Sequence, residues 1–159
     1  MLPVLLIGVG KMKEKWEREA CAEYVKRLGR FCALEICELS DQPEPDKPSE
    51  ALNRRVMEKE GREILARIRP NDRVVALCIK GNSYDSEQFA AKLAGWSMDG
   101  RRLVLVIGGS LGLSDEVIAR ADEKLSFSKM TFPHQLMRVI LLEQLYRGFK
   151  IGANERYHK

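Results

Sequence analysis

The sequence predicts an α/β fold in which a parallel sheet is covered by helices on both faces. Three segments are apolar almost throughout, which is typical of strands buried on both sides. They are residues 2–9, 73–79 and 103–107. Helical patterns alternate with them, and this alternation is typical of three-layer α/β/α proteins. Because the chain has 159 residues, no internal repeat and no clear linker, we expect a single domain over residues 1–159.

The first half of the chain adds two helices and a further strand to this pattern. Four residues recur at the four-residue spacing of an amphipathic helix in residues 14–28: Trp16, Ala20, Tyr24 and Leu28. Residues 32–39 alternate apolar and polar side chains, which predicts the second strand. A proline-rich, acidic loop over residues 40–50 then leads to a charged helix over residues 51–68.

The second half of the chain continues the alternation. After the strand at 73–79, residues 80–83 form a loop, and Ser86 is expected to cap a helix over about 87–98. Ser114 is expected to cap a short helix that follows the strand at 103–107. The remaining expected elements are a fifth strand over residues 125–130 and a last helix over about 133–149.

The bulk composition is that of a soluble globular protein. Hydrophobic residues make up 45% of the chain and charged residues 31%. The N-terminus lacks the basic-then-apolar order of a signal peptide, and no apolar run reaches the roughly 18–20 residues of a membrane span. We therefore expect a cytoplasmic protein with no membrane partner. The net charge of +4 permits an acidic partner such as RNA without identifying one.

The cysteine pattern predicts reduced thiols and no metal site. None of the four cysteines belongs to a C-x-x-C pair, and neither of the two histidines lies near a cysteine in the sequence. A zinc site needs several such ligands together. Buried, reduced side chains are the ordinary state of cysteines outside such motifs.

Two glycine sites follow predicted strands. Gly8 and Gly10 resemble the start of a dinucleotide fingerprint, but Lys13 stands where the third glycine would be. The second site, residues 108–112, has the sequence GGSLG at the carboxyl end of a strand, where open α/β sheets bind ligands. Acidic residues at 115–116 would repel a phosphate, so this loop suits a neutral or cationic ligand. A tight turn without a ligand remains the alternative.

The C-terminal stretch combines an apolar helix with polar residues that need a partner or a function. Pro133 fits the first turn of a helix. Near the start of this helix, His134 suits either a structural hydrogen bond or a role as a general base, and Arg138 lies one turn further on. The tail ends in Tyr157, His158 and Lys159, which is either a frayed terminus or a group suited to stacking on bases and contacting phosphates.

Taken together, four segments resemble the RlmH (YbeA-like) branch of the SPOUT methyltransferases. They are the start GVGKMK, the loop VIGGSLGLS, the stretch LSFSKMTFPHQLMRVILLEQLYR and the terminal YHK. The resemblance covers essentially the whole chain. It implies a C-terminal deep trefoil knot in the parallel sheet, whereas connection rules alone predict an unknotted, doubly wound sheet.

The resemblance also implies an activity. Members of this branch transfer a methyl group from S-adenosyl-L-methionine (SAM) to N3 of a pseudouridine in 23S rRNA, act on assembled ribosomes and work as homodimers. The acidic start of the helix after the GGSLG loop agrees with this cofactor, which has no phosphate and carries a sulfonium cation. We expect the apolar last helix to form the dimer face.

Matching positions assign the site residues. The cofactor-binding residues implied are Leu77, Gly108, Gly109, Phe127, Ser128, Lys129, Met130, Thr131 and Phe132. The catalytic candidates are His134, Arg138, Tyr157, His158 and Lys159, with the tail reaching the active site of the partner subunit. His134, His158 and Glu143 are candidates for the base that removes the N3 proton, and a base from the tail is favoured. Arg138 or Lys159 would stabilise the developing negative charge.

Two other functions stay open at this point. One is a nucleotide-dependent enzyme of doubly wound type, which would need a phosphate-binding loop that the sequence lacks. The other is a non-catalytic ribosome-associated RNA-binding module that keeps the fold.

Overall fold

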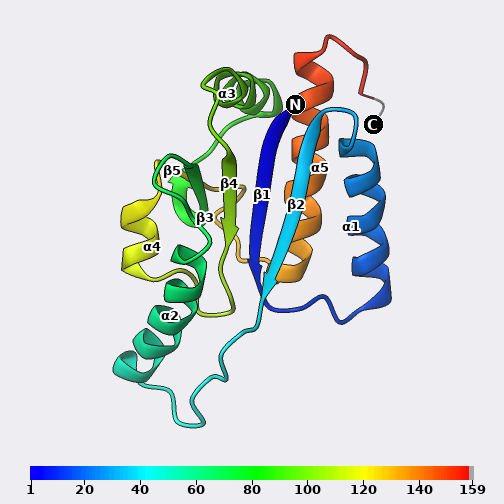
Figure 1. Cartoon of the computed structure of the whole chain (residues 1–159). Coiled ribbons are helices and arrows are strands. Elements are labelled where there is room, and N and C mark those ends of the chain that lie inside the picture. The colour runs from blue at the N-terminus through cyan, green and yellow to red at the C-terminus, as the bar shows by residue number, and fades with distance from the viewer. Residues whose placement is uncertain (158–159) are drawn as a thin grey trace.

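The chain builds a five-stranded parallel sheet in the order β2-β1-β4-β3-β5 (Figure 1). The computed structural model describes residues 1–157. Every neighbouring pair of strands in the sheet is parallel, as predicted. The strands are β1 (Leu2–Val9), β2 (Cys32–Leu39), β3 (Arg73–Asn82), β4 (Leu103–Ile107) and β5 (Glu123–Leu125).

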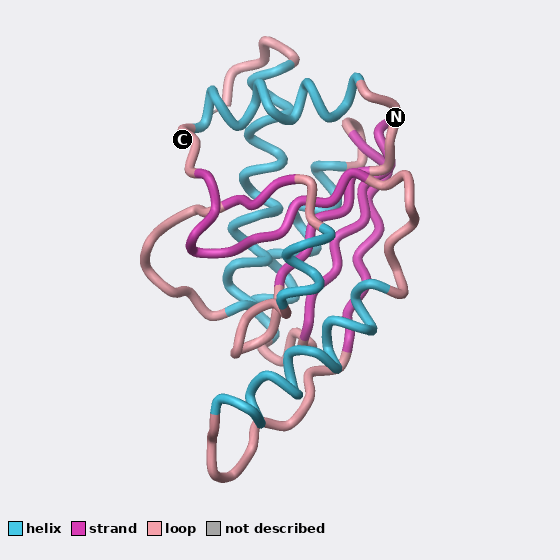
Figure 2. Tube along the Cα trace, turned by 90° about the vertical axis from the view of Figure 1, so that its left-hand side faces the viewer, coloured by secondary structure: helices cyan, strands magenta, loops and turns pink. Residues whose placement is uncertain are grey.

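Helices cover both faces of the sheet. One apolar cluster joins the sheet to three of them: α1 (Lys15–Leu28), α3 (Ser86–Met98) and α5 (His134–Gly152). A second cluster joins the opposite face to α2 (Glu50–Leu65) and α4 (Asp115–Arg120). Figures 1 and 2 both show α2 and the loop before it projecting past the end of the sheet.

Alternation along β1 explains why this strand is apolar throughout. Leu6 and Ile7 are both fully buried, but Leu6 belongs to the cluster under α1, α3 and α5. Ile7 points the other way, into the cluster under α2 and α4. Successive side chains of a strand face opposite sides, so a central strand with helices on both faces needs no polar position.

The strand predicted over residues 125–130 is wrong beyond Leu125. The Ser126 N–H still donates to the Asn82 carbonyl of β3 at 2.9 Å, but local hydrogen bonds follow: Ser126 Oγ donates to the Ser128 carbonyl at 3.1 Å. The Met130 N–H donates to Ser128 Oγ at 3.0 Å. Short hydroxyl side chains compete with regular structure in this way.

The boundaries around β3 and α3 also differ from the prediction. β3 runs to Asn82 instead of ending at Ile79, so the expected loop over residues 80–83 is largely strand. Ser86 is the first helical residue of α3, and the cap is Asp85. The Asp85 carboxylate accepts from the Gln88 N–H at 2.8 Å, and the Gln88 side chain accepts from the Asp85 N–H at 2.9 Å. This reciprocal capping box is worth more than a single serine cap.

β3 departs from the regular sheet where it meets β5. It pairs with β4 only as far as Ala76, and then both Leu77 and Asn82 pair with Leu125. The close approach leaves no room for a side chain at Gly81, where a Cβ would lie 2.7 Å from the Leu125 nitrogen. The last residues of β3 are therefore packed backbone against backbone on β5.

The last helix packs between the two other helices of its layer. α5 contacts both α1 and α3, and its buried side includes Leu141, Leu142 and Leu145. It begins at His134, directly after Pro133, close to the predicted boundary. No helix within residues 1–157 is long and apolar enough to cross a membrane.

Candidate cofactor and catalytic site

Three of the predicted cofactor residues lie near the point where β4 separates from β3 and its neighbour β5. β3 separates from β4 after the pair Ala76 and Val106, so Leu77 stands at the branch point. Gly108 follows the last residue of β4, and Phe127 comes two residues after the end of β5. Parallel strands that branch apart open a crevice at their carboxyl ends, which is where ligands of α/β sheets bind. The fold thus brings Leu77, Gly108 and Phe127 to the edge of the sheet that is formed by the carboxyl ends of its strands.

The GGSLG loop is folded tightly on itself. Gly112 has φ +90°, and its N–H donates to the Gly109 carbonyl at 3.0 Å. A Cβ at Gly108 would lie 2.9 Å from the Gly112 carbonyl carbon. Glycine is therefore required at 108 for packing and favoured at 112 for its backbone conformation. Ser114 then caps α4 as predicted, with its Oγ accepting from the Val117 N–H at 3.4 Å.

A buried carboxylate supports this loop from α2. Glu60 is only 5% exposed, and one of its oxygens would lie 3.1 Å from a Cβ at Gly109. Its other oxygen accepts from the Gln42 N–H at 2.9 Å. Burial, and then the charges of Asp41, Glu63 and Glu44, raise the pKa of Glu60 above its ordinary value of 4.5, despite the hydrogen bond from Gln42. Sequence reasoning missed Glu60, because nothing in a charged helix marks the one carboxylate that is buried.

We expect the substitution Glu60→Gln to stabilise the protein at neutral pH. The folded state binds a proton at Glu60 more tightly than the unfolded state does. Stability is therefore lost as the pH rises from about 4.5 through the raised folded-state pKa. Glutamine keeps the shape and removes the titration.

Melting temperatures from pH 4 to pH 8 check this expectation. Above pH 6 the curve of Glu60→Gln should lie above that of the wild type, and the two should converge in acid. The control is Glu58→Gln on the same helix, whose curve should not separate from that of the wild type above pH 6 in this way. A Glu60→Gln variant that is less stable at every pH would contradict the expectation.

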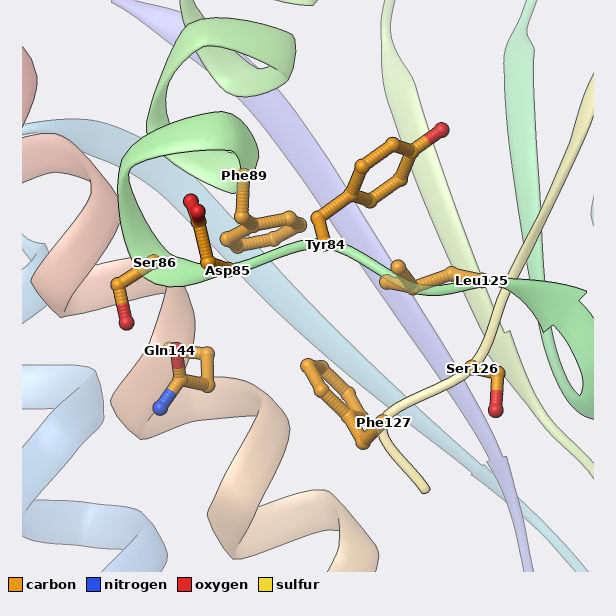
Figure 3. A pocket seen from close by; sticks show the side chains of 8 residues that line it. All are labelled: Tyr84, Asp85, Ser86, Phe89, Leu125, Ser126, Phe127 and Gln144. Atoms are coloured by element: carbon orange, nitrogen blue, oxygen red, sulfur yellow. The ribbon is translucent and has the colours of Figure 1, made fainter. Parts of the chain in front are cut away.

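The segment 127–132 leads from β5 into α5. Phe127 packs edge-on against Phe89 of α3, with ring centroids 6.4 Å apart. Met130 is 73% exposed, so the segment is anchored at Phe127 and open to solvent at its middle. A cavity of about 320 Å³ adjoins this anchor, between the start of α3 and α5 (Figure 3). Its lining residues are Tyr84, Asp85, Ser86, Phe89, Leu125, Ser126, Phe127 and Gln144. Neither Leu77 nor the glycine loop lines this cavity.

Arg138 and His134 lie at the carboxyl end of β1, beneath the glycines of the GVGKMK segment. Arg138 is 2% exposed and donates from Nη1 to Glu38 Oε2 at 2.6 Å and from Nη2 to the Gly10 carbonyl at 2.9 Å. A Cβ at Gly8 would lie 2.4 Å from Arg138 Nη2, and one at Gly10 would lie 2.8 Å from His134 Nε2. The two glycines therefore make room for side chains of α5, which accounts for them without a dinucleotide.

Burial and nearby charge shift the pKa values of Glu38 and His134 in this cluster. Burial raises the pKa of Glu38, but the hydrogen bonds from Arg138 and the Met12 N–H outweigh this and leave it below its ordinary value. Burial, and then the charge of Arg138, lower the pKa of His134. His134 is thus neutral at pH 7, and its Nε2 has no hydrogen-bond partner within residues 1–157. A neutral imidazole has one nitrogen that can accept a proton, but Nε2 is buried here beneath Gly10, so it would have to become accessible before it could act on a substrate.

The C-terminal tail folds back onto the middle of α5. The Tyr157 hydroxyl donates to Glu143 Oε1 at 2.6 Å, and Arg147 stacks over the Tyr157 ring, 4.0 Å from its centroid. Burial and the bond to Glu143 raise the pKa of Tyr157 to about 12, so this phenol keeps its proton at neutral pH. Glu143 also accepts from Arg147 and Gln144. The predicted catalytic residues His158 and Lys159 lie outside the described residues.

Within one chain, the catalytic candidates form two separate groups. His134 and Arg138 lie at the start of α5, whereas Tyr157 is held at Glu143. Nine residues separate His134 from Glu143, which is about 13 Å along a helix. Glu38, which the sequence did not indicate, completes the first group.

No group of three His, Cys, Asp or Glu side chains within the described part of the chain is arranged to hold a metal ion. The four cysteines are free thiols, with Cys21 and Cys32 buried and Cys37 and Cys78 half-buried.

Several known proteins have sequences that are similar to that of this chain. Residues 2–158 match the family described as predicted SPOUT methyltransferases. A protein of Bifidobacterium adolescentis named "Ribosomal RNA large subunit methyltransferase H" is 54% identical over 159 residues, covering 99% of this chain and all of the relative. A protein of the same name from Streptococcus thermophilus is 50% identical over 159 residues, with the same coverage of both chains.

Solved structures share the fold at low sequence identity. A probable methylase family protein from Haemophilus influenzae superposes with a TM-score of 0.57 at 15% identity, covering 100% of this chain and 72% of its own. Likeness at this level concerns the fold alone, and it agrees with the parallel sheet and flanking helices described above. The match over residues 2–158 and the near-complete coverage of relatives at 50–54% identity together mean that the chain belongs to the SPOUT methyltransferase family.

Proposed function

We propose that this chain is a SAM-dependent rRNA methyltransferase that methylates N3 of a pseudouridine in 23S rRNA of the assembled ribosome. The name of the relatives, ribosomal RNA large subunit methyltransferase H, supports the substrate class. The geometry that carries the proposal is the branch between β3 and β4, because it gathers Leu77, Gly108 and Phe127 at one sheet edge. As a ribosomal substrate requires, the protein would act in the cytoplasm, as one domain over residues 1–159.

The residues at this edge fit SAM better than a phosphorylated cofactor. Gly108 and Gly109 offer bare backbone, and Glu60 places a carboxylate directly beside Gly109. Asp115 and Glu116 add negative charge at the first turn of α4. SAM supplies an electrophilic methyl group on a cationic sulfur, and a fold related to this one has been solved from Legionella pneumophila in complex with SAM. We therefore assign cofactor binding to the residues predicted from the sequence: Leu77, Gly108, Gly109 and Phe127, Ser128, Lys129, Met130, Thr131 and Phe132.

The acceptor nitrogen must lose its proton to a base. The hydrogen bonds and pKa shifts of the candidate side chains make some of them better suited to this role than others. Tyr157 keeps its proton, and Glu143 already accepts four hydrogen bonds. His134 is neutral with a free Nε2 and remains a candidate, together with His158 of the tail. Arg138 is buried against Glu38, so we assign it to holding the start of α5 and, through its charge, keeping His134 neutral.

We further propose that the protein works as a homodimer. Tyr157 lies about two and a half turns of helix from His134 in the same chain, so the two groups meet only if a second chain supplies one of them. The exposed side of α5 would form the contact. Light scattering at micromolar concentration should show a dimer, and a monomer with full activity would contradict this arrangement.

A methyl-transfer assay tests the proposed function. Labelled SAM is incubated with ribosomes from cells that lack the modification, and the labelled nucleotide is mapped by mass spectrometry. Incorporation at one pseudouridine is expected. Calorimetry should detect S-adenosylhomocysteine but neither NAD nor ATP. Binding without incorporation would favour a non-catalytic ribosome-associated module.

A further inference from the structure

An exposed tryptophan stands at the start of α1, at the same sheet edge as the glycine loop. The chain has two tryptophans, and they differ sharply: Trp96 is 4% exposed in the core, whereas Trp16 is 55% exposed. α1 follows the carboxyl end of β1, whose last paired residue on β4 is Gly8, opposite Ile107. Trp16 therefore belongs to the edge at which β4 leads into Gly108.

We propose that Trp16 is a stacking platform for an unpaired base of the RNA substrate, with Lys11 and Lys13 contacting the neighbouring phosphates. The inference rests on the proposed function, since it requires an RNA substrate. Proteins recognise single-stranded RNA in this way, with bases stacked on aromatic rings beside cations that follow the backbone.

The loop directly before α1, which carries Lys11 and Lys13, is held rigidly. Arg18 donates from Nη1 to the carbonyls of Met12 and Lys13, at 3.2 Å and 2.6 Å. The Met12 N–H donates to Glu38 Oε2 at 3.0 Å, and Glu38 is fixed in turn by Arg138. These bonds hold the backbone of residues 12–13 from both sides. The side chains on it are thus presented in a fixed place, which lowers the entropy lost on binding.

The charges beside Trp16 suit a polyanion. Lys11 and Lys13 are exposed, and neither has an ion-pair partner among residues 1–157. Lys15 is 3.6 Å from Glu19, a loose and exposed pair that a phosphate can replace. Residues 11–16 hold three lysines against the one exposed carboxylate of Glu14, and this excess of cations favours a nucleic acid over an apolar partner.

The loop that leads to the platform begins next to the catalytic candidates. The loop begins at Gly10, whose Cβ position would be 2.8 Å from His134 Nε2. Segment 127–132 ends one residue before Pro133 and α5. A base on Trp16 would therefore be a near neighbour of the nucleotide to be methylated, and stacking would hold the strand while that nucleotide enters the site.

Two variants and an oligonucleotide test the platform directly. The probe is a 12-nucleotide oligoadenylate, and the signal is tryptophan fluorescence, which only exposed Trp16 can lose by stacking. Quenching is expected in the wild type and is expected to be absent in Trp16→Leu. Trp16→Leu, which keeps apolar bulk without an aromatic ring, should bind fluorescein-labelled probe about tenfold or more weakly. Trp16→Phe should retain most of the affinity.

Kinetics on ribosomes complete the test. Trp16→Leu should raise KM for unmodified ribosomes about tenfold, with the loss concentrated in KM rather than kcat, and Trp16→Phe should restore it. The control is Met98→Ala, which removes an 87% exposed apolar side chain from α3 and should change neither constant. An unchanged KM in Trp16→Leu overturns the platform, as does conversion of a dimer to a monomer, which would make Trp16 a subunit contact. If the wild type itself transfers no methyl group, the proposed function fails, while the fluorescence result still decides the platform.

Discussion

Replacing Gly81 by alanine is expected to lower the free energy of unfolding by about 3 kcal/mol. A Cβ at this position would lie 2.7 Å from both the Leu125 nitrogen and the Lys124 carbonyl carbon, and 2.8 Å from the Leu125 carbonyl carbon. These are backbone atoms of β5, which cannot rotate away as a side chain can. The added methyl group must therefore push β3 and β5 apart and weaken their pairing.

Gly95 provides a matched control for this substitution. It lies inside α3, and a Cβ there would have no atom within 4 Å. Gly95→Ala should therefore stabilise the protein by about 0.5–1 kcal/mol, because alanine favours the helix and loses less entropy on folding. Urea denaturation of both variants gives the comparison. Equal stability of Gly81→Ala and Gly95→Ala would show that β3 and β5 are less tightly packed than described.

Removal of residues 157–159 is expected to lower the rate of methyl transfer at least about 100-fold, the usual contribution of a positioned acid or base. Tyr157 is held by Glu143 and Arg147 beside the middle of α5. If α5 forms the dimer face, the tail is delivered to the partner's site. Most of the packing of α5 lies on its other side, so the melting temperature should change little.

Two variants separate the parts of this effect. Tyr157→Phe keeps the ring on Arg147 and removes only the 2.6 Å hydrogen bond to Glu143, so a smaller loss of about tenfold is expected. Arg156→Ala, at an exposed position next to Tyr157, should retain full activity. Single-turnover assays on ribosomes provide the rates. A truncated enzyme that works at the normal rate would remove the tail from the mechanism.

The sequence was sufficient to predict the sheet and its helical layers, because a strand that is buried on both faces is apolar in composition. β1 from Val4 to Ile7 and β4 throughout are apolar at successive positions, and each of these positions is buried in one of the two clusters. The family resemblance was needed for the rest of the topology. The SPOUT fold is confirmed, and it implies the C-terminal knot, which general connection rules argue against.

The periodicity of the sequence could not predict the contacts between residues that are far apart in the chain. Nothing local to Glu38 or Glu60 shows that one will meet Arg138 and the other Gly109, since these pairs form only after the sheet is assembled. The strand predicted past Leu125 failed for a related reason. Its alternating pattern is real, but β3 ends at Asn82, whose carbonyl accepts from the Ser126 N–H, and the hydroxyls of Ser126 and Ser128 then bond locally.

The contact between Arg138 and Gly10 has a consequence for synthesis on the ribosome. Its two residues are 128 positions apart, and those of the Arg138–Glu38 pair are 100 apart. Contacts of such long sequence separation slow folding, and here the C-terminal partner belongs to the last helix to be translated. Gly8 and Gly10 thus leave a gap in the N-terminal strand that stays unfilled until the chain is nearly complete. During synthesis, the packing around β1 is therefore completed only after the last helix, α5, has been translated.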